Sequence, residues 1–166
     1  MTTPSPFDAS TPLAREVADI TRRRMALAAE TFPLPEKTRV FTVANQKGGV
    51  GKTTTAVNLA AALAHAGARV LVIDLDPQGN ASTALGVEHR SDTVSVYDVI
   101  IGDVPMREVV QASPDFESLD CIPATIHLAG AEIELVSMVA REQRLRSALE
   151  TYIAESDAPP HYVFID

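Results

Sequence analysis

The residues whose types and spacing predict chemistry most clearly lie in residues 43–55, which read Val-Ala-Asn-Gln-Lys-Gly-Gly-Val-Gly-Lys-Thr-Thr-Thr. The ending matches G-x-x-x-x-G-K-[ST], a loop whose backbone N–H groups and following helix N-terminus surround phosphate groups. In such a loop Lys52 neutralises β- and γ-phosphate charge, and the Thr53 hydroxyl is a ligand of Mg²⁺. The phosphate-binding residues that this loop predicts are Gly48, Gly49, Val50, Gly51, Lys52, Thr53 and Thr54.

The loop departs from the ordinary pattern in two places. Gln46 stands where the first glycine is expected, and Lys47, immediately after it, has no role in the ordinary pattern. The glycines permit positive φ and leave room for an anion beside the backbone. The alternative, a flexible hairpin with solvated lysines, is disfavoured because an apolar run precedes the loop and a helical pattern follows it.

Three aspartates follow apolar runs that are typical of buried strands. Asp74 and Asp76 come after Val70–Ile73, and Asp166 comes after residues 162–165. Open α/β folds bind ligands at the carboxyl ends of parallel strands, so we predict that Asp166 holds a water on Mg²⁺. Successive strand residues point to opposite faces, so the bend after the strand decides which of the other two acids faces the ligand. We favour Asp76; the alternative is that both acids cap the next helix.

The surrounding pattern predicts an α/β fold of the P-loop NTPase type, with a mainly parallel sheet flanked by helices. Arg39–Ala44 reads as a central strand covered on both faces. The small side chains of Lys52–His65 predict a helix that packs closely on the sheet, and Gly67 is expected to end it. Further strands are expected at residues 70–73, 119–122 and 162–165, further helices at 93–101, 105–111, 126–139 and 141–154, and a switch loop at 78–83.

The chain is expected to divide into an N-terminal extension, residues 1–36, and the N-terminal part of a P-loop ATPase domain, residues 37–166. Residues 1–10 read as a mobile tail. Thr11 and Pro12 are suited to be the N-cap and first residue of a helix. This helix carries three arginines, residues 22–24, for which a solvated face is favoured over contact with DNA phosphates or acidic partners.

Composition excludes several classes of protein. The net charge of −8 over 166 residues argues against a surface that covers DNA, because nonspecific DNA binding needs Lys and Arg to neutralise phosphates. The single cysteine, Cys121, excludes an internal disulfide or iron–sulfur framework, and we expect it to be a buried small hydrophobe. The four histidines lack metal-binding spacing and are assigned no chemistry.

Three blocks of the sequence, residues 45–54, 72–80 and 162–166, resemble the ParA/MinD-type deviant Walker ATPases, most closely the ParA/Soj partitioning ATPases. With matching spacing, the resemblance covers residues 38–166. It implies that the protein binds ATP and Mg²⁺, and that the sheet continues past Asp166. On this view the chain is an N-terminal fragment, incomplete at its C-terminus, and we expect it to be inactive as an ATPase by itself.

The resemblance also implies roles for individual residues. Lys47 would reach across a sandwich dimer to the partner's phosphates, and Asp76 would belong to the switch that positions the attacking water. Asp74 would lie nearer to Mg²⁺. The predicted catalytic residues are therefore Lys47, Lys52 and Asp76, and the predicted metal-site residues are Thr53, Asp74 and Asp166.

The function implied is DNA segregation by a cytoplasmic, nucleoid-associated ATPase that dimerises on ATP. A ParB-type centromere-binding protein would stimulate hydrolysis, nonspecific DNA would bind mainly through residues downstream of this chain, and no membrane would be involved. The alternatives are a MinD-like membrane-cycling ATPase, which needs a basic amphipathic C-terminal helix, and a non-catalytic fragment that only binds a partner or nucleotide. A nitrogenase-iron-protein-like electron carrier is disfavoured by the single cysteine.

Overall fold

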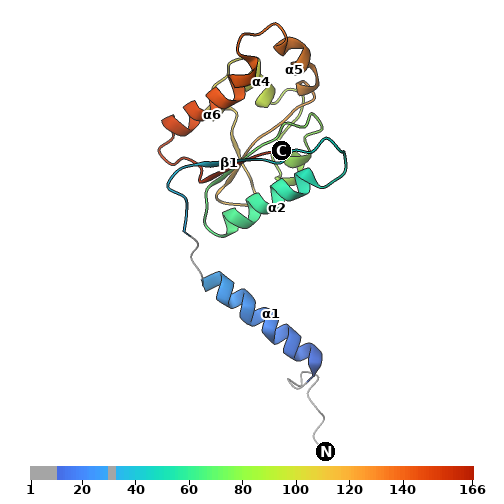
Figure 1. Ribbon diagram of the computed structural model, residues 1–166, viewed down its shortest axis with the longest axis vertical. Coiled ribbons are helices and arrows are strands. Elements are labelled where there is room, and N and C mark those ends of the chain that lie inside the picture. Colours follow the sequence, from blue (N-terminus) through green and yellow to red (C-terminus); the bar gives the residue numbers. More distant parts are fainter. Residues whose placement is uncertain (1–10, 30–32) are drawn as a thin grey trace, which may run out of the picture. The chain divides into compact units, whose positions relative to one another are not determined.

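The computed structural model describes residues 11–29 and 33–166, and the chain divides into two compact units, Met1–Pro33 and Leu34–Asp166 (Figure 1). In the first unit helix α1 spans Pro12–Ala29. The backbone N–H of Ala14 donates to Oγ1 of Thr11 at 3.2 Å, which is the N-cap bond predicted for this helix start. The expected tail, residues 1–10, lies outside the described residues.

The second unit is built on one five-stranded sheet. The strands are β1 Arg39–Thr42, β2 Val70–Ile73, β3 Gln111–Ala112, β4 Leu119–Ile122 and β5 Tyr162–Ile165. Their spatial order is β1-β5-β2-β4-β3, and only the short β3 runs antiparallel to its neighbour. The predicted α/β architecture with a mainly parallel sheet is confirmed.

Helices cover both faces of this sheet, with α2 on one side and α4 and α6 on the other (Figure 1). The helices are α2 Lys52–His65, α3 Asn80–Ala84, α4 Val96–Ile100, α5 Leu128–Leu135 and α6 Arg144–Glu155, with 3₁₀ turns η1 Met106–Glu108 and η2 Arg141–Gln143. No helix within the described residues is long and apolar enough to cross a membrane.

The core consists of two layers because side chains alternate along the strands. Val70 and Val72 of β2 pack with Ala60 and Ala64 of α2, while the other two residues of β2 pack with α4 and α6. All four residues of β2 are buried, as expected for an apolar strand covered on both faces. Cys121 of β4 is also fully buried and forms no disulfide, which confirms its prediction as a small core residue.

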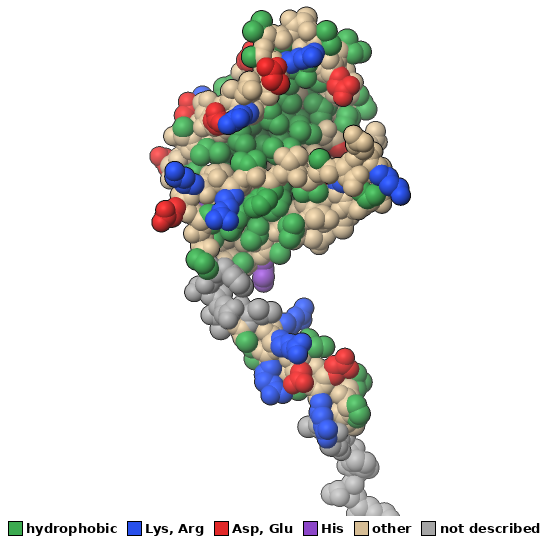
Figure 2. Space-filling view, in the orientation of Figure 1, with side chains coloured by type: hydrophobic (Ala, Val, Ile, Leu, Met, Phe, Trp, Pro, Cys, Tyr) green, Lys and Arg blue, Asp and Glu red, His purple; other side chains and the backbone are tan. Residues whose placement is uncertain are grey.

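The prediction that the first strand is central is wrong for the described sheet. β1 pairs with β5 and lies at the edge, where Val40 and Phe41 are 47% and 44% exposed. Figure 2 shows hydrophobic side chains gathered on the face where β1 lies in Figure 1. A short apolar run has the same composition in a central strand and in an edge strand, so the sequence pattern does not distinguish the two.

Four predicted helices differ from expectation. The run at 126–139 forms only Leu128–Leu135, and the run at 141–154 forms a 3₁₀ turn followed by α6, Arg144–Glu155. The run at 93–101 forms only Val96–Ile100, because Ser95 caps its start in a capping box with Asp98. The run at 105–111 forms one 3₁₀ turn, and Gln111 begins β3 instead of ending a helix. Pairing of β3 with β4 is a long-range contact that local helical periodicity does not reveal.

Candidate functional site

The glycine-rich loop leaves β1 and ends at the start of α2. Gly49 and Gly51 have φ values of 69° and 86°, in the left-handed region that favours glycine. A Cβ added to Gly48, Gly49 or Gly51 would meet no other atom within 4 Å, so the space beside this backbone is open. The predicted glycines therefore do shape the loop, and they leave its backbone accessible to a ligand.

The N-terminus of α2 is available to an anion. Gly51 is its N-cap and has no side chain to bond the first turn, which begins at Lys52. The N–H groups at a helix start have no intrahelical acceptor, and together with the helix dipole they favour a negatively charged ligand. Within the loop the N–H of Lys47 donates to Oδ1 of Asn45 at 2.9 Å, which leaves the exposed Lys47 side chain outside this turn.

The sheet brings the end of β5 between the phosphate loop and the predicted switch. The N–H of Val43, at the entry to the loop, donates to the carbonyl oxygen of Ile165 at 2.8 Å. On the other side, the N–H of Asp166 donates to the carbonyl of Ile73 at 3.0 Å, and its own carbonyl accepts the N–H of Leu75 at 3.0 Å. Residues from distant parts of the chain thus form one carboxyl edge.

Asp166 has the electrostatic environment of a cation ligand. Both of its carboxylate oxygens are buried, and neither has a hydrogen-bond partner among the described residues. A buried carboxylate without donors is costly, and a bound cation removes that cost. No cluster of three or more His, Cys, Asp or Glu side chains forms a metal cage in the described part of the chain. Mg²⁺ suits such a site, because it typically takes one or two protein oxygens and completes its shell with water and substrate phosphates.

Asp74 is fully buried and holds the segment that follows β2. Its Oδ1 accepts the N–H of Asp76 at 3.0 Å, and its Oδ2 accepts the N–H and the hydroxyl of Ser82 at 2.9 and 2.7 Å. Burial raises the pKa of Asp74, the bonds from Ser82 oppose that rise, and the negative charge of Asp166 adds to it. Asp74 and Asp166 follow neighbouring strands, because Ile73 of β2 pairs with Ile165 of β5.

Asp76 lies on the outer turn rather than in the core. Its Oδ1 accepts the N–H of Gln78 at 2.9 Å and its Oδ2 accepts the side-chain amide of Asn80 at 3.2 Å. The bend after β2 therefore turns Asp74 inward and leaves Asp76 half-buried at the rim. The structure brings Asp166 beside β1, the strand that enters the loop, and places Asp74 one strand further along, after β2. Asp76 stands on the turn just beyond Asp74.

Sequence reasoning missed Ser82, whose hydroxyl is central to this arrangement. Ser82 Oγ donates to Asp74 and also accepts the backbone N–H of Ala124, at 3.2 Å. Its only signal in the sequence is a hydroxyl residue among small residues in a short helix, a pattern that many exposed positions share.

We predict that Ser82→Ala lowers the free energy of unfolding by about 2 kcal/mol, because it removes a donor from a buried carboxylate and an acceptor from a buried N–H. Urea denaturation followed by circular dichroism measures this change. Ser91→Ala, at an exposed serine, is the matched control and should change the free energy by less than about 0.5 kcal/mol. Equal midpoints for the two variants would contradict the anchoring role of Ser82.

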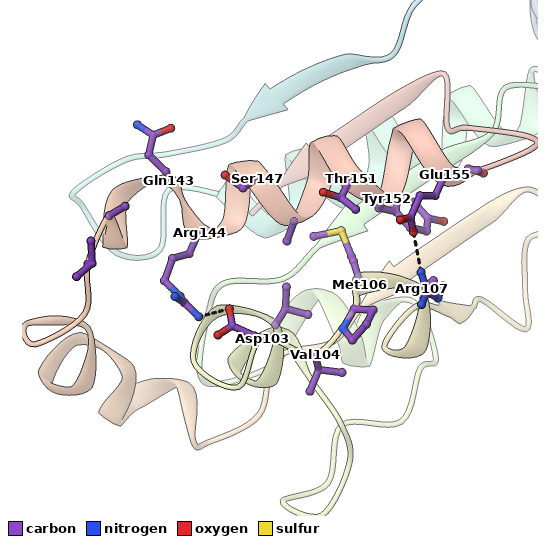
Figure 3. A pocket seen from close by; sticks show the side chains of 16 residues that line it. Asp103, Val104, Met106, Arg107, Gln143, Arg144, Ser147, Thr151, Tyr152 and Glu155 are labelled. Atoms are coloured by element: carbon purple, nitrogen blue, oxygen red, sulfur yellow. Dashed lines mark hydrogen bonds and ion pairs between the residues drawn. The ribbon is translucent and has the colours of Figure 1, made fainter.

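A separate hollow of about 670 Å³ lies between η1 and α6 (Figure 3). Ion pairs stand at its two ends, Arg107 with Glu155 at 2.6 Å and Arg144 with Asp103. No residue of the glycine-rich loop lines it. The candidate site is therefore the carboxyl edge of the sheet.

A glycine loop between a parallel strand and a helix N-terminus, with an aspartate at the end of the adjacent strand, defines a P-loop nucleotide-binding protein. A family described as "AAA domain" matches residues 38–166, and the chain belongs to this family of P-loop ATPases. The predicted resemblance to ParA/Soj-type proteins is also confirmed by the relatives that follow.

Two curated relatives are partitioning or sporulation proteins. The chain is 50% identical over 128 residues to the sporulation initiation inhibitor protein Soj of Bacillus subtilis, a match that covers 77% of this chain and 49% of Soj. It is also 50% identical to the chromosome partitioning protein ParA of Caulobacter vibrioides, covering 77% of this chain and 47% of that protein. The chain thus spans about half the length of the curated relatives it matches.

A solved structure shows the same fold with a nucleotide. Cobyrinic acid a,c-diamide synthase from Mycobacterium smegmatis, with bound ADP and magnesium, superimposes with a TM-score of 0.70 at 42% identity. The match covers 78% of this chain and 51% of the synthase.

Proposed function

We propose that this chain is the nucleotide-binding part of a ParA-type ATPase that uses ATP and Mg²⁺ to segregate DNA. The observation that carries the proposal is the buried, unpartnered carboxylate of Asp166 on the strand beside the one that enters the glycine loop. A cation is needed there, and Mg²⁺ bound to ATP phosphates is the cation that a phosphate loop brings. The relatives named Soj and ParA support the segregation role.

In this proposal the loop and the acids have separate tasks. Backbone N–H groups of the loop and the start of α2 hold the phosphates, and Lys52 neutralises their charge. Thr53 would be a ligand of Mg²⁺ and Asp166 would hold a water on it, and the metal would supply positive charge to offset the negative charge of the phosphate oxygens. Asp74 adds negative charge beside this metal site while it holds the switch segment in place.

Two residues act on the hydrolysis step itself. Asp76 orients the attacking water, which its place on the outer turn supports, since its carboxylate is held by the turn and not buried in the core. Lys47 supplies a positive charge to the nucleotide of a second subunit, so that hydrolysis depends on an ATP-bound homodimer. The exposure of the Lys47 side chain supports action outside its own subunit.

The wider role follows from the same assignment. Residues 37–166 form the N-terminal part of the ATPase domain, and residues 1–36 are an extension. The protein acts in the cytoplasm on the nucleoid, and a ParB-type protein stimulates its hydrolysis. The net charge of −8 supports a DNA-binding surface formed mainly by other residues of the full-length protein. ATP-dependent binding to lipid vesicles in place of DNA would favour the MinD-like alternative.

We predict that Asp76→Ala in the full-length protein keeps ATP binding but accumulates as a dimer, because the nucleotide is bound and not cleaved. Asp166→Ala should instead lose Mg²⁺-dependent binding. Gel filtration with ATP and Mg²⁺ separates the two outcomes, and Asp92→Ala, at an exposed acid, is the control. An Asp76→Ala protein that hydrolyses ATP normally and stays monomeric would show that Asp76 does not position the water.

A further inference from the structure

His89 contacts the turn that carries Asp76, at Gly79. Gly79 ends this turn with φ of 63°, and a Cβ there would lie 2.5 Å from Cδ2 and 3.1 Å from Nε2 of His89. The imidazole ring therefore packs directly against the Gly79 backbone. Gly79 has two reasons to be glycine, its left-handed conformation and this close approach.

Both ring nitrogens of His89 have partners. Nδ1 lies 3.1 Å from the carbonyl oxygen of Val87, and Nε2 lies 3.2 Å from Oγ1 of Thr83. A carbonyl oxygen only accepts, so Nδ1 carries the hydrogen, and Nε2 of the neutral ring is an acceptor. The Thr83 hydroxyl has one hydrogen and two acceptors within reach, Nε2 of His89 and the carbonyl of Gly79, which is 2.9 Å away.

These contacts complete a set of restraints around one short segment. The N–H of Gly79 donates to the carbonyl of Asp76 at 2.8 Å, which closes the turn. On its inner side α3 is held by the bonds between Asp74 and Ser82, and on its outer side it is held by His89. If the His89 ring moved away, α3 would lose its contact at Thr83 but would keep the bonds between Asp74 and Ser82.

We propose that His89 is a positioning residue that holds the Gly79 corner by packing its ring on the Gly79 backbone and by accepting the Thr83 hydroxyl, and thereby fixes the place of the Asp76 carboxylate during ATP hydrolysis. This inference rests on the proposed role of Asp76. The Thr83 hydroxyl can donate either to Nε2 of His89 or to the carbonyl of Gly79. The turn can therefore shift without leaving this hydroxyl unsatisfied, because its hydrogen bond passes from one acceptor to the other. The contact therefore restrains the turn and still permits the movement that a switch requires.

The kinetic test compares His89→Ala and Thr83→Val in the full-length protein. We expect each variant to lower kcat roughly tenfold and to leave KM for ATP within about twofold, because the phosphate loop is untouched and only the step after binding is affected. The double variant should be no slower than the single ones, since both remove the same contact. His127→Ala, at a histidine that bonds to the carbonyl of Ser91, is the control and should keep kcat.

A spectroscopic measurement tests the geometry without any activity. In the 166-residue chain labelled with ¹⁵N-histidine, we expect the neutral His89 ring to be the Nδ1–H tautomer, and Thr83→Val to shift its Nε2 resonance. An Nε2–H tautomer would overturn the proposal, as would an active protein whose His89→Ala variant keeps its kcat. A wild-type full-length protein without ATPase activity would overturn the proposed function instead, so the two failures are distinguishable.

Discussion

Lys52→Ala in the full-length protein is expected to abolish measurable binding of ATP with Mg²⁺. Lys52 is the first residue of α2, directly after the left-handed Gly51, and in the proposed site its ammonium group would neutralise the phosphates that the helix start holds. Loss of this charge-assisted contact should weaken binding roughly 100-fold or more, which corresponds to about 3 kcal/mol. Isothermal titration calorimetry with ATP and Mg²⁺ measures the change.

The chain offers a matched control for this experiment. Lys37 is an exposed lysine outside the loop, so Lys37→Ala removes the same charge without touching the site. We expect its affinity for the nucleotide to equal that of the unmodified protein. Unchanged affinity in Lys52→Ala would remove the phosphate-loop assignment, and with it the proposed function.

Lys47→Ala is expected to keep nucleotide binding and to lose hydrolysis. If Lys47 acts on the partner's phosphates as an arginine finger does, its loss should slow hydrolysis by roughly 10³- to 10⁵-fold, or about 4–7 kcal/mol. Its backbone is held in the loop by Asn45, so the substitution should leave the loop conformation intact. Calorimetry for binding and phosphate release for hydrolysis separate the two effects.

Mixing experiments show whether Lys47 acts across the dimer. A Lys52→Ala subunit has lost its own nucleotide site but still carries Lys47. Adding it to the Lys47→Ala protein should restore part of the hydrolysis, because each mixed dimer then combines one intact nucleotide site with one Lys47. A Lys47→Ala protein with full activity by itself would contradict the role.

The sequence by itself determined several local elements and was enough to name the candidate site residues. Helix α2 has the predicted bounds, Lys52–His65, and β2 and β4 also have theirs, because each is a local pattern of apolar or small residues with a clear end signal. The left-handed glycines of the loop were predictable for the same reason, since a phosphate loop requires them. The aspartates could be named because each directly follows an apolar strand.

Only the tertiary structure decided how these pieces meet. It inserted β5 between β1 and β2, placed β1 at the edge of the described sheet, and added β3 where a helix was expected. It also turned Asp74 inward onto Ser82 and brought His89 against Gly79. The physical reason is that these features depend on contacts between residues that are distant along the chain or that meet around a bend. Strand order, the burial of a carboxylate and the partners of a histidine are all of this kind. A local pattern of residue types does not record such contacts.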